Sequence, residues 1–389
     1  MDFNSSIYDI ILTHPMKPDN TPKMIFSVAG GKGGVGKSIF SVALGTKLAM
    51  DGHSVTLVDL DLGAANLHTY LGIIKKTPTI ADFILKKVPS LHDVLVETSQ
   101  ENMRLISGSE FVPGMANPAH WMKLKIMRHV KSLAADYIII DLGAGVHFNT
   151  LDFFSMSDRG IVVTAPEPGA VMNAYSFIKG ALFRRLQHIF KNHPDIAPVI
   201  DTETKKTGGE SGMGLEMLTE QIKTLSPDML PLMQEIEHEF CPALVVNRTS
   251  EGHRHVLVRN LMTLCRDKLG VNIEHVGNLP DIPEITDYLL KIPAFLNTWS
   301  GKSYLDAINN ISDKLIRRTG LHVHAATKSD FSDEDVEMII HLMETLDDGI
   351  FSGTGRSACK LRMYFKPAEV VDFLISRGVT HEAFYTQER

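Results

Sequence analysis

One stretch of the chain limits its fold more than any other, and it reads Gly-Lys-Gly-Gly-Val-Gly-Lys-Ser over residues 31–38. The stretch satisfies the pattern G-x-x-x-x-G-K-[ST], with Gly31, Gly36, Lys37 and Ser38 in the fixed places. Glycines allow close approach of the backbone to an anion, and successive N–H groups form a concave nest for phosphate oxygens. The pattern therefore predicts a nucleoside triphosphate site, in which Lys37 reaches the β- and γ-phosphates and the Ser38 hydroxyl ligates Mg²⁺.

The residues on either side of this loop have the character that such a site requires. Residues 24–28 are predicted to form a buried strand, and residues 39–50 a helix that ends at Asp51-Gly52. A helix that begins at the loop points the positive end of its dipole at the phosphates. The strand–loop–helix order therefore favours a phosphate-binding loop over a glycine-rich turn without a ligand.

The composition is that of an ordinary globular protein, because 22% of the 389 residues are charged and 44% are hydrophobic. The net charge of −7 argues against a broad nucleic-acid-binding face, although a local basic patch would be compatible with it. The three cysteines, Cys241, Cys265 and Cys359, are far apart, which fits a reducing compartment and gives no zinc or iron–sulfur framework. We find no signal peptide and no stretch of transmembrane length, so we expect a cytoplasmic protein.

Apolar strands alternate with helices after the loop. The pattern predicts an α/β fold of the P-loop NTPase type, with a mostly parallel central sheet covered by helices on both faces. Phosphates bind beyond the carboxyl ends of the strands in such sheets. The further predicted strands cover residues 54–59, 103–107, 137–141, 160–164, 243–247 and 273–277, and two of the helices cover residues 122–134 and 303–318.

Two regions exceed a minimal domain of this kind. We predict a leader over residues 1–22, an ATPase domain over 23–320 with a helical insertion at about 181–240, and a small C-terminal helical module over 321–389. In that module, residues 330–348 contain eight Asp or Glu and no Lys or Arg, whereas residues 356–366 contain four basic residues and no acid. We favour two solvated helical faces that attract each other, and a partner-docking module is the alternative.

Carboxylates follow two of the predicted strands. Asp59-Leu60-Asp61 ends one strand, and Asp141 ends another and precedes Leu142-Gly143-Ala144-Gly145. A buried aspartate needs a cation partner, which hydrated Mg²⁺ provides in a P-loop protein, and Gly145 could donate its N–H to the γ-phosphate. Asp141 could instead cap a helix, and either Asp59 or Asp61 could be a cap or a surface residue.

Taken together, these motifs resemble those of the MinD/ParA family of deviant P-loop ATPases. The family's loop reads K-G-G-x-x-K-[ST], which residues 32–38 match through the additional Lys32, and its second and third motifs resemble residues 58–63 and 141–145. Within the family, the chain resembles the FlhG/FleN-type branch, which regulates flagellar number and placement. That likeness rests on residues 59–67, 141–146 and 164–175, and the whole resemblance covers roughly residues 22–318 without the insertion.

The resemblance implies a mechanism. ATP joins two subunits face to face as a homodimer, Lys32 reaches the partner's phosphates, Asp61 positions the attacking water and Asn247 recognises the base, with residues 277–280 as the adenine-side loop. We therefore expect ATP and Mg²⁺ as cofactors. The expected catalytic residues are Lys32, Lys37 and Asp61, the expected nucleotide-binding residues are Gly31, Lys32, Gly33, Gly34, Val35, Gly36, Lys37, Ser38, Ile39, Gly145, Asn247, Arg248 and Pro280, and the expected metal ligands are Ser38, Asp59 and Asp141.

The chain departs from the branch at both ends. We find no Gln-containing activator helix of the FlhG type in residues 1–22, and residues 367–389 carry two Arg and no Lys against four acids. That composition suits an anionic membrane surface poorly, whereas MinD and FlhG end in a basic amphipathic helix. Membrane attachment through this tail is therefore weakly supported.

The function that we favour is a dimerising ATPase switch, slow alone and stimulated by an unidentified regulatory protein. It would control the placement or number of a flagellum, a division site or polar machinery, in the cytoplasm with recruitment to a pole or the inner membrane surface. The main alternative is a ParA-like ATPase that segregates DNA or cargo. An iron–sulfur carrier is less favoured, since the chain has no C-x-x-C and no cysteine near the third motif. A tyrosine kinase is less favoured because Leu62-Gly63, and not an arginine, follows the second aspartate motif, and a scaffold that binds ATP without turnover is less favoured because all three acids are present.

Overall fold

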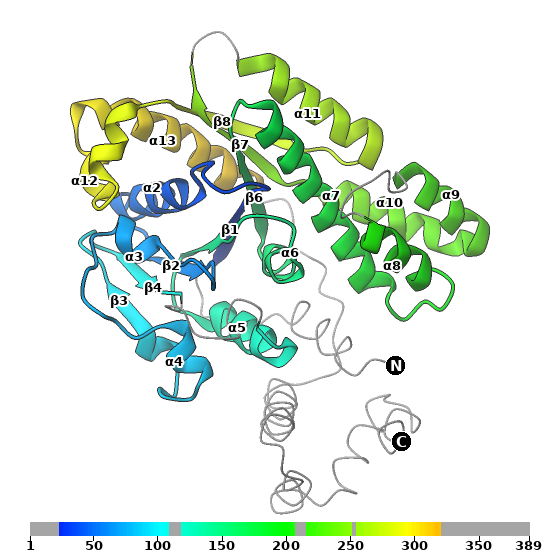
Figure 1. Ribbon diagram of the computed structural model, residues 1–389, viewed down its shortest axis with the longest axis horizontal. Coiled ribbons are helices and arrows are strands. Elements are labelled where there is room, and N and C mark those ends of the chain that lie inside the picture. The colour runs from blue at the N-terminus through cyan, green and yellow to red at the C-terminus, as the bar shows by residue number, and fades with distance from the viewer. Residues whose placement is uncertain (1–22, 109–117, 207–214, 251–253, 320–389) are drawn as a thin grey trace, which may run out of the picture. The chain divides into compact units, whose positions relative to one another are not determined.

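The computed structural model of the protein describes residues 23–108, 118–206, 215–250 and 254–319 (Figure 1). Residues 19–118 and 133–323 form one compact unit, and the chain segment that contains helix α5 (His120–Ser132) belongs to a second unit, which is considered by itself. The predicted leader and the predicted C-terminal module lie outside the described residues.

The first unit is built on an eight-stranded sheet in the order β3-β4-β2-β5-β1-β6-β7-β8. Every neighbouring pair is parallel except β3 and β4, so the prediction of a mostly parallel sheet is confirmed. The antiparallel edge strand β3 was not predicted. The strands are β1 (Met24–Ala29), β2 (Val55–Leu60), β3 (Leu95–Glu97), β4 (Met103–Ile106), β5 (Tyr137–Leu142), β6 (Arg159–Thr164), β7 (Ala243–Thr249) and β8 (Glu274–Pro280).

Alternate residues of β1 show how both faces of the sheet are covered. Phe26 and Val28 are fully buried in a cluster with side chains of α2, α12 and α13. Ser27, which points to the other face, donates a hydrogen bond to the carbonyl oxygen of Phe153 in α6. Strands buried on both faces are typical of parallel α/β sheets, which explains why they read as continuous apolar runs. These helices are α2 (Lys37–Met50), α6 (Phe148–Ser155), α12 (Ile292–Leu296) and α13 (Trp299–Thr319).

Shorter elements connect β2 with β4 and β8 with α12. They are α3 (Leu67–Tyr70), α4 (Ile80–Ile84), the 3₁₀ turn η1 (Leu91–Val94) and the 3₁₀ turn η3 (Pro283–Tyr288). Capping boxes fix the starts of α4 and η1, because Thr79 and Ser90 each exchange hydrogen bonds with an aspartate three residues later.

The long helix α7 (Pro168–Phe190) carries an additional group of helices at its C-terminal end, as Figure 1 shows. This group consists of α8 (Ala197–Lys206), α9 (Leu215–Leu225), the 3₁₀ turn η2 (Pro227–Met229) and α10 (Leu230–Glu239), and α11 (Arg254–Leu269) follows β7. It lies where the helical insertion was predicted, although α7 occupies the first part of the predicted range. Arg185 of α7 pairs with Glu239 of α10 at 2.7 Å.

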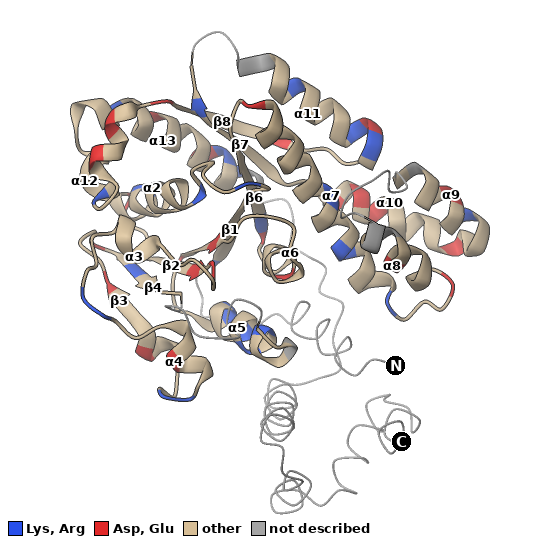
Figure 2. Ribbon diagram, viewed as in Figure 1, with Lys and Arg blue, Asp and Glu red and all other residues tan. Residues whose placement is uncertain are grey.

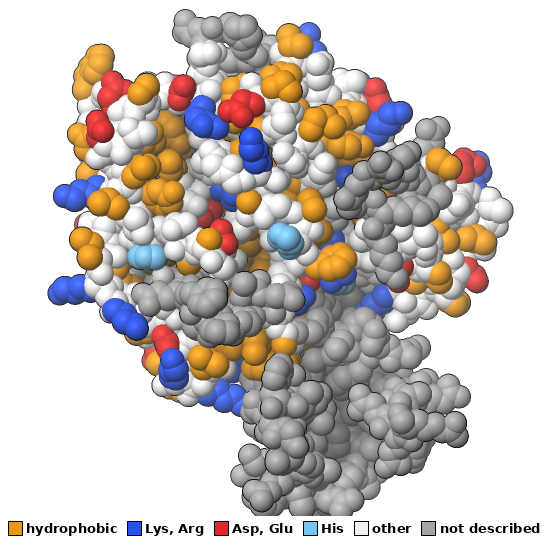
Figure 3. Space-filling view, in the orientation of Figure 1, with side chains coloured by type: hydrophobic (Ala, Val, Ile, Leu, Met, Phe, Trp, Pro, Cys, Tyr) orange, Lys and Arg blue, Asp and Glu red, His pale blue; other side chains and the backbone are white. Residues whose placement is uncertain are grey.

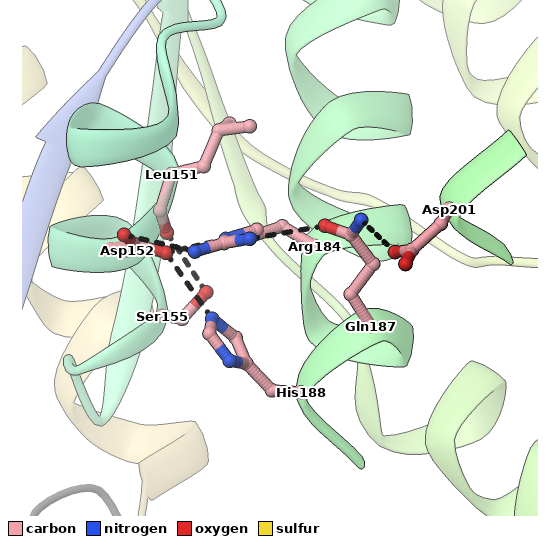
Figure 4. A network of polar contacts seen from close by, with 7 residues as sticks. All are labelled: Leu151, Asp152, Ser155, Arg184, Gln187, His188 and Asp201. Atoms are coloured by element: carbon pink, nitrogen blue, oxygen red, sulfur yellow. Dashed lines mark hydrogen bonds and ion pairs between the residues drawn. The ribbon is translucent and has the colours of Figure 1, made fainter. Parts of the chain in front are cut away.

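A buried polar network ties α6, α7 and α8 together (Figure 4). Asp152 of α6 is fully buried, and its carboxylate accepts hydrogen bonds from Arg184 Nε at 2.6 Å and Arg184 NH2 at 3.2 Å. The Nε2 of His188 lies 3.2 Å from Asp152 Oδ1. Gln187 extends the chain of contacts, since it accepts from Arg184 and donates to Asp201 of α8 at 2.7 Å.

Helix α5 confirms the helix that the sequence predicts at residues 122–134, displaced by two residues. None of the helices in the described ranges is long and apolar enough to cross a membrane.

Candidate functional site

The predicted phosphate loop joins β1 to α2 at the carboxyl edge of the sheet. Gly34 and Gly36 have φ angles of 78° and 96°, in the left-handed region that favours glycine. Gly36 is the N-cap of α2, and neither a side-chain cap nor an acidic residue in the first turn satisfies the helix N-terminus. Its N–H groups and helix dipole are thus available to an anion.

Two glycines of the loop are also required by close packing. A Cβ atom on Gly31 would lie 1.9 Å from the carbonyl oxygen of Asn173, in the first turns of α7. A Cβ on Gly36 would lie 2.1 Å from Nδ2 of Asn247, which donates a hydrogen bond to the Val35 carbonyl oxygen at 3.0 Å. The loop is therefore held between α7 and the end of β7, and the predicted base-recognition residue Asn247 braces it.

Lys37 and Ser38 lie with the predicted acids. Lys37 is only 8% exposed, and burial lowers the pKa of its ammonium while the charges of Asp141 and Asp61 oppose that shift. The Ser38 hydroxyl donates to Asp141 Oδ2 at 2.6 Å. Asp61 stands beside Gly143, where an added Cβ would lie 3.1 Å from Asp61 Oδ1. The structure thus brings Lys37, Ser38, Asp61 and Asp141 together.

Asp59 and Asp141 are paired residues on the adjacent strands β2 and β5. Burial, followed by the charge of Asp141, raises the pKa of Asp59 to about 8. Burial also raises the pKa of Asp141 to about 6, although hydrogen bonds from Ser38 and Ser41 and the charge of Lys37 oppose the shift. Both shifts arise mainly because burial disfavours the ionised carboxylates, and a neighbouring acid adds to each shift.

The donors at this position fit Mg²⁺, a hard cation that prefers oxygen ligands. The Ser38 hydroxyl and the Asp141 carboxylate are both oxygen donors, and an added cation would relieve the repulsion between the acids. Within the described residues, no group of three or more His, Cys, Asp or Glu side chains is arranged to hold a metal ion. Mg²⁺ commonly completes its shell with water and substrate phosphates, which suits such a partial donor set.

Asp59 is oriented differently from Asp141. Its Oδ1 accepts from the Asp61 N–H at 3.1 Å, and its Oδ2 accepts from the N–H groups of Asn66 and Leu67 at 2.9 and 3.0 Å. These bonds shape the loop after β2 and thereby place Asp61. The role of Asp59 as a metal ligand stays a prediction.

Lys32 has a setting unlike that of Lys37. Its side chain is 53% exposed, and its Nζ lies 4.0 Å from Oε2 of Glu167, the N-cap residue of α7. The other oxygen of Glu167 lies 3.3 Å from NH2 of Arg248, a residue with a left-handed φ of 55°. Lys32 is thus held at the surface, away from the buried acids that surround Lys37.

Exposed apolar side chains border the loop. The Gly145 N–H donates to the Gly30 carbonyl oxygen at 3.2 Å, which places the residues after Gly145 against the loop. Val146 and Phe148 there are 44% and 52% exposed, and Met172, next to Asn173, is 53% exposed. Figure 3 shows hydrophobic side chains interspersed with charged ones over the face in view.

For the remaining predicted residues, the structure gives a position in the fold but no contact that indicates a role in the site. Ile39 is half-buried and packs against the apolar core under α2. Pro280 ends β8, where it pairs with Thr249 of β7. Gly33 has no atom within 4 Å of an added Cβ. Roles for these residues in base or phosphate binding stay predictions.

Sequence reasoning missed three contributors to the site, namely Ser41, Glu167 and Asn173. Ser41 lies three residues after Ser38, and this spacing on one helix face could have indicated that both hydroxyls meet the same partner. Glu167 and Asn173 act at the loop through tertiary contacts that only the fold provides.

The fold and this site define a P-loop NTPase. Residues 21–188 match the ParA family model, described as NUBPL iron-transfer P-loop NTPase. This segment, which is less than half of the chain, resembles the ParA/MinD family of P-loop NTPases, and the relatives that follow support its likeness to the FlhG/FleN-type branch.

Two curated relatives each match part of the chain. The flagellum site-determining protein YlxH of Helicobacter pylori is 30% identical over 162 residues, which cover 39% of this chain and 52% of that protein. The antiactivator FleN of Pseudomonas aeruginosa is 32% identical over 166 residues, which cover 41% of this chain and 56% of that protein. The matched segment thus spans about half the length of each relative.

Solved structures agree on the fold. The ParA family ATPase from Chlorobium tepidum TLS aligns with a TM-score of 0.50 over 75% of this chain and 98% of that one, at 16% identity.

The cysteines of the described ranges lie away from the third motif: Cys241 precedes β7, and Cys265 is buried in α11, where burial raises its pKa to about 12.

Proposed function

We propose that the protein is an ATP-driven dimerising switch that controls the number or placement of a cellular structure. The observation that carries the proposal is the contrast between the two lysines of one loop. Lys37 is buried beside Asp141 and Asp61, where the phosphates of its own nucleotide would lie, whereas Lys32 is half exposed and held only by a surface carboxylate. A cation in this position can serve a phosphate that another subunit supplies.

The residues of the site have distinct tasks in this proposal. Lys37 and the N-terminal amides of α2 bind the triphosphate, and Ser38 with Asp141 would hold Mg²⁺. The cation, when bound there, would neutralise negative charge on the phosphates. Asp61 is placed by the loop that Asp59 organises, and it orients the water that attacks. Asn247, whose amide donates to the Val35 carbonyl oxygen of the loop, would recognise the adenine base.

The border of the loop supports a second copy as the partner. Val146, Phe148 and Met172 are exposed apolar side chains that border the loop carrying the half-exposed Lys32. An apolar patch with a cation at its edge suits a face that becomes buried when two copies meet. Lys32 would complete the partner's site only in the dimer, which makes hydrolysis slow in the monomer and open to stimulation by a regulatory protein.

The names of the relatives indicate the kind of process. One is a flagellum site-determining protein and the other is an antiactivator, so we favour a flagellar or polar structure as the object of control. We place the protein in the cytoplasm, with recruitment to a pole or to the inner membrane surface. A DNA-segregating ATPase is less favoured, because the net charge is −7 and Figure 2 shows acidic residues interspersed with basic ones over the described helices.

The test is sedimentation of the full chain with Mg²⁺ and ATP. Asp61→Ala should accumulate as an ATP-bound dimer, since the water is no longer positioned, and Lys32→Ala should bind nucleotide but stay monomeric. Lys47→Ala, on the same helix as Lys37 but paired with Asp51, is the control and should behave as the natural chain does. A monomeric Asp61→Ala protein, or normal dimerisation of Lys32→Ala, would contradict the proposal.

The structure under control can be identified by capture with the Asp61→Ala dimer. Recovery of flagellar basal-body proteins would support the flagellar assignment. Recovery of DNA that depends on ATP would favour the segregation ATPase instead.

A further inference from the structure

Ser41 is a fully buried serine in the second turn of α2, outside the phosphate-loop pattern. Its hydroxyl lies 2.8 Å from Oδ1 of Asp141 and 3.1 Å from the carbonyl oxygen of Lys37. Serine in a helix interior commonly donates to the carbonyl four residues earlier, which here belongs to Lys37. Ser41 therefore has two acceptors for a single proton.

The carboxylate is the stronger of the two acceptors. A hydroxyl has one proton to donate, and hydrogen bonds to a charged oxygen are shorter and stronger than bonds to a neutral carbonyl. The distances agree, because the Asp141 carboxylate oxygen lies nearer to the Ser41 hydroxyl than the Lys37 carbonyl oxygen does. Ser41 accordingly donates to Asp141 whenever that carboxyl is ionised.

The two oxygens of Asp141 are thus held by two hydroxyls from one helix. The Ser38 hydroxyl donates to Oδ2 at 2.6 Å, and the Ser41 hydroxyl donates to Oδ1 at 2.8 Å. A carboxylate with a single hydrogen bond could still rotate about its Cβ–Cγ bond. Two hydrogen bonds, one to each oxygen, fix the plane of the carboxylate. Ser38 keeps its lone pairs for Mg²⁺ while its O–H donates to Asp141, so this hydrogen bond can persist when the metal binds.

We propose that Ser41 is a positioning residue that fixes the Asp141 carboxylate for the Mg²⁺–nucleotide complex. The proposal rests on the function proposed above, because it assigns Asp141 to that complex. Ser41 itself touches neither metal nor nucleotide, and it acts only through Asp141. Groups that orient a metal's ligands commonly change metal affinity about 10- to 100-fold when they are removed.

A purely structural serine would behave differently. Ser27 of β1 is the matched case, since it is also fully buried and its hydroxyl donates to a main-chain oxygen, that of Phe153, at 3.1 Å. Ser27→Ala and Ser41→Ala each remove one buried hydroxyl and leave a space the size of one oxygen atom. Only Ser41→Ala removes a hydrogen bond to Asp141.

The test is a titration of the full-length protein with Mn²⁺, a paramagnetic substitute for Mg²⁺, in the presence of a non-hydrolysable ATP analogue. Ser41→Ala should weaken Mn²⁺ binding about tenfold, and Ser41→Thr, which keeps the hydroxyl, should restore most of it. Binding of the analogue in EDTA should be the same for all variants. Ser27→Ala should bind Mn²⁺ as the natural chain does, and melting curves confirm that each variant folds.

The outcomes separate the two proposals. Wild-type Mn²⁺ affinity in Ser41→Ala, or an equal loss in Ser27→Ala, would overturn the role of Ser41 while leaving the proposed function intact. Absence of analogue binding in the natural chain would overturn the proposed function and, with it, this role.

Discussion

The carboxylate of Glu167 lies 4.0 Å from the ammonium group of Lys32 in one chain. Both side chains are more than half exposed, with 53% of Lys32 and 54% of Glu167 accessible. Exposed ion pairs contribute only about 0.2–1 kcal/mol. The pair is therefore strong enough to orient Lys32 but weak enough to be replaced when a phosphate is offered.

The Glu167→Gln variant tests whether the ion pair with Lys32 competes with dimerisation. Because the variant no longer attracts Lys32, ATP-dependent dimerisation should become tighter, by at most about fivefold, which corresponds to about 1 kcal/mol. Sedimentation with Mg²⁺ and ATP measures the change. Glu220→Gln, which breaks an exposed pair with Lys223 on α9, is the control and should leave dimerisation unchanged. Weaker dimerisation of Glu167→Gln would show that Glu167 serves the dimer directly.

Gly31 and Gly33 form a matched pair within one loop. A Cβ on Gly31 would lie 1.9 Å from the Asn173 carbonyl oxygen, a backbone atom, whereas a Cβ on Gly33 would meet nothing within 4 Å. Gly31→Ala should therefore destabilise the protein without nucleotide by about 1–3 kcal/mol, and Gly33→Ala should stay within about 0.5 kcal/mol. Urea denaturation measures both, and equal stabilities would contradict the packing of α7 against the loop.

The buried acids predict how stability depends on pH in the protein without nucleotide and Mg²⁺. The pKa of Asp59 is raised to about 8 and that of Asp141 to about 6, mainly by burial, so both bind protons in the native state that the unfolded chain has released. Protonation of these two carboxyls therefore favours the native state. The resulting stabilisation is fully present below about pH 4, where both are protonated in the unfolded chain too, and it is lost as the pH rises towards about 8. The slope is at most about 1.4 kcal/mol per pH unit for each carboxyl.

Urea midpoints across this range measure the effect. Asp59→Asn cannot ionise, so the fall in its stability between about pH 5 and about pH 8 should be smaller than in the natural chain. An equal fall in the two proteins would show that Asp59 does not titrate in this window. Bound Mg²⁺ and nucleotide should reduce the fall in the natural chain, because a cation favours the ionised acids.

Much of this fold follows from local sequence pattern. Six of the seven predicted strands are mostly buried apolar runs, whereas β8 is largely half-buried. All seven lie within two residues of their predicted ends, except that β8 extends three residues further at its C-terminal end. The loop glycines and Asp141 were also predictable, because a phosphate site fixes their spacing relative to one strand and one helix.

Other features depend on contacts that the sequence does not encode locally. Strand β3 has three residues, none of them buried, and forms by pairing with β4, so no periodicity marks it. Glu167 reads as a residue before a proline-initiated helix, and only the fold places it beside Lys32, 135 residues earlier, and Arg248. Asp59 and Asp141 look alike at the ends of strands, yet one binds backbone N–H groups and the other binds hydroxyls.

The network around Asp152 predicts a large effect from a residue outside the nucleotide site. Asp152→Ala removes the partner of Arg184, whose side chain is 19% exposed, and of His188. A buried cation that loses its partner costs about 3–5 kcal/mol, so urea denaturation should show a loss of this size. Asp267→Ala, which breaks an exposed pair with Arg266, should change stability by less than about 0.5 kcal/mol.

The same variant should loosen the additional helices in particular. Arg184 also donates to Gln187, which in turn donates to Asp201 of α8, so the loss of Asp152 weakens a chain of contacts that ends in this helix. Amide hydrogen exchange should therefore accelerate in α8 more than in β1, which lies in the centre of the sheet. A stability loss below about 1 kcal/mol with unchanged exchange in α8 would show that Asp152 does not hold these helices together.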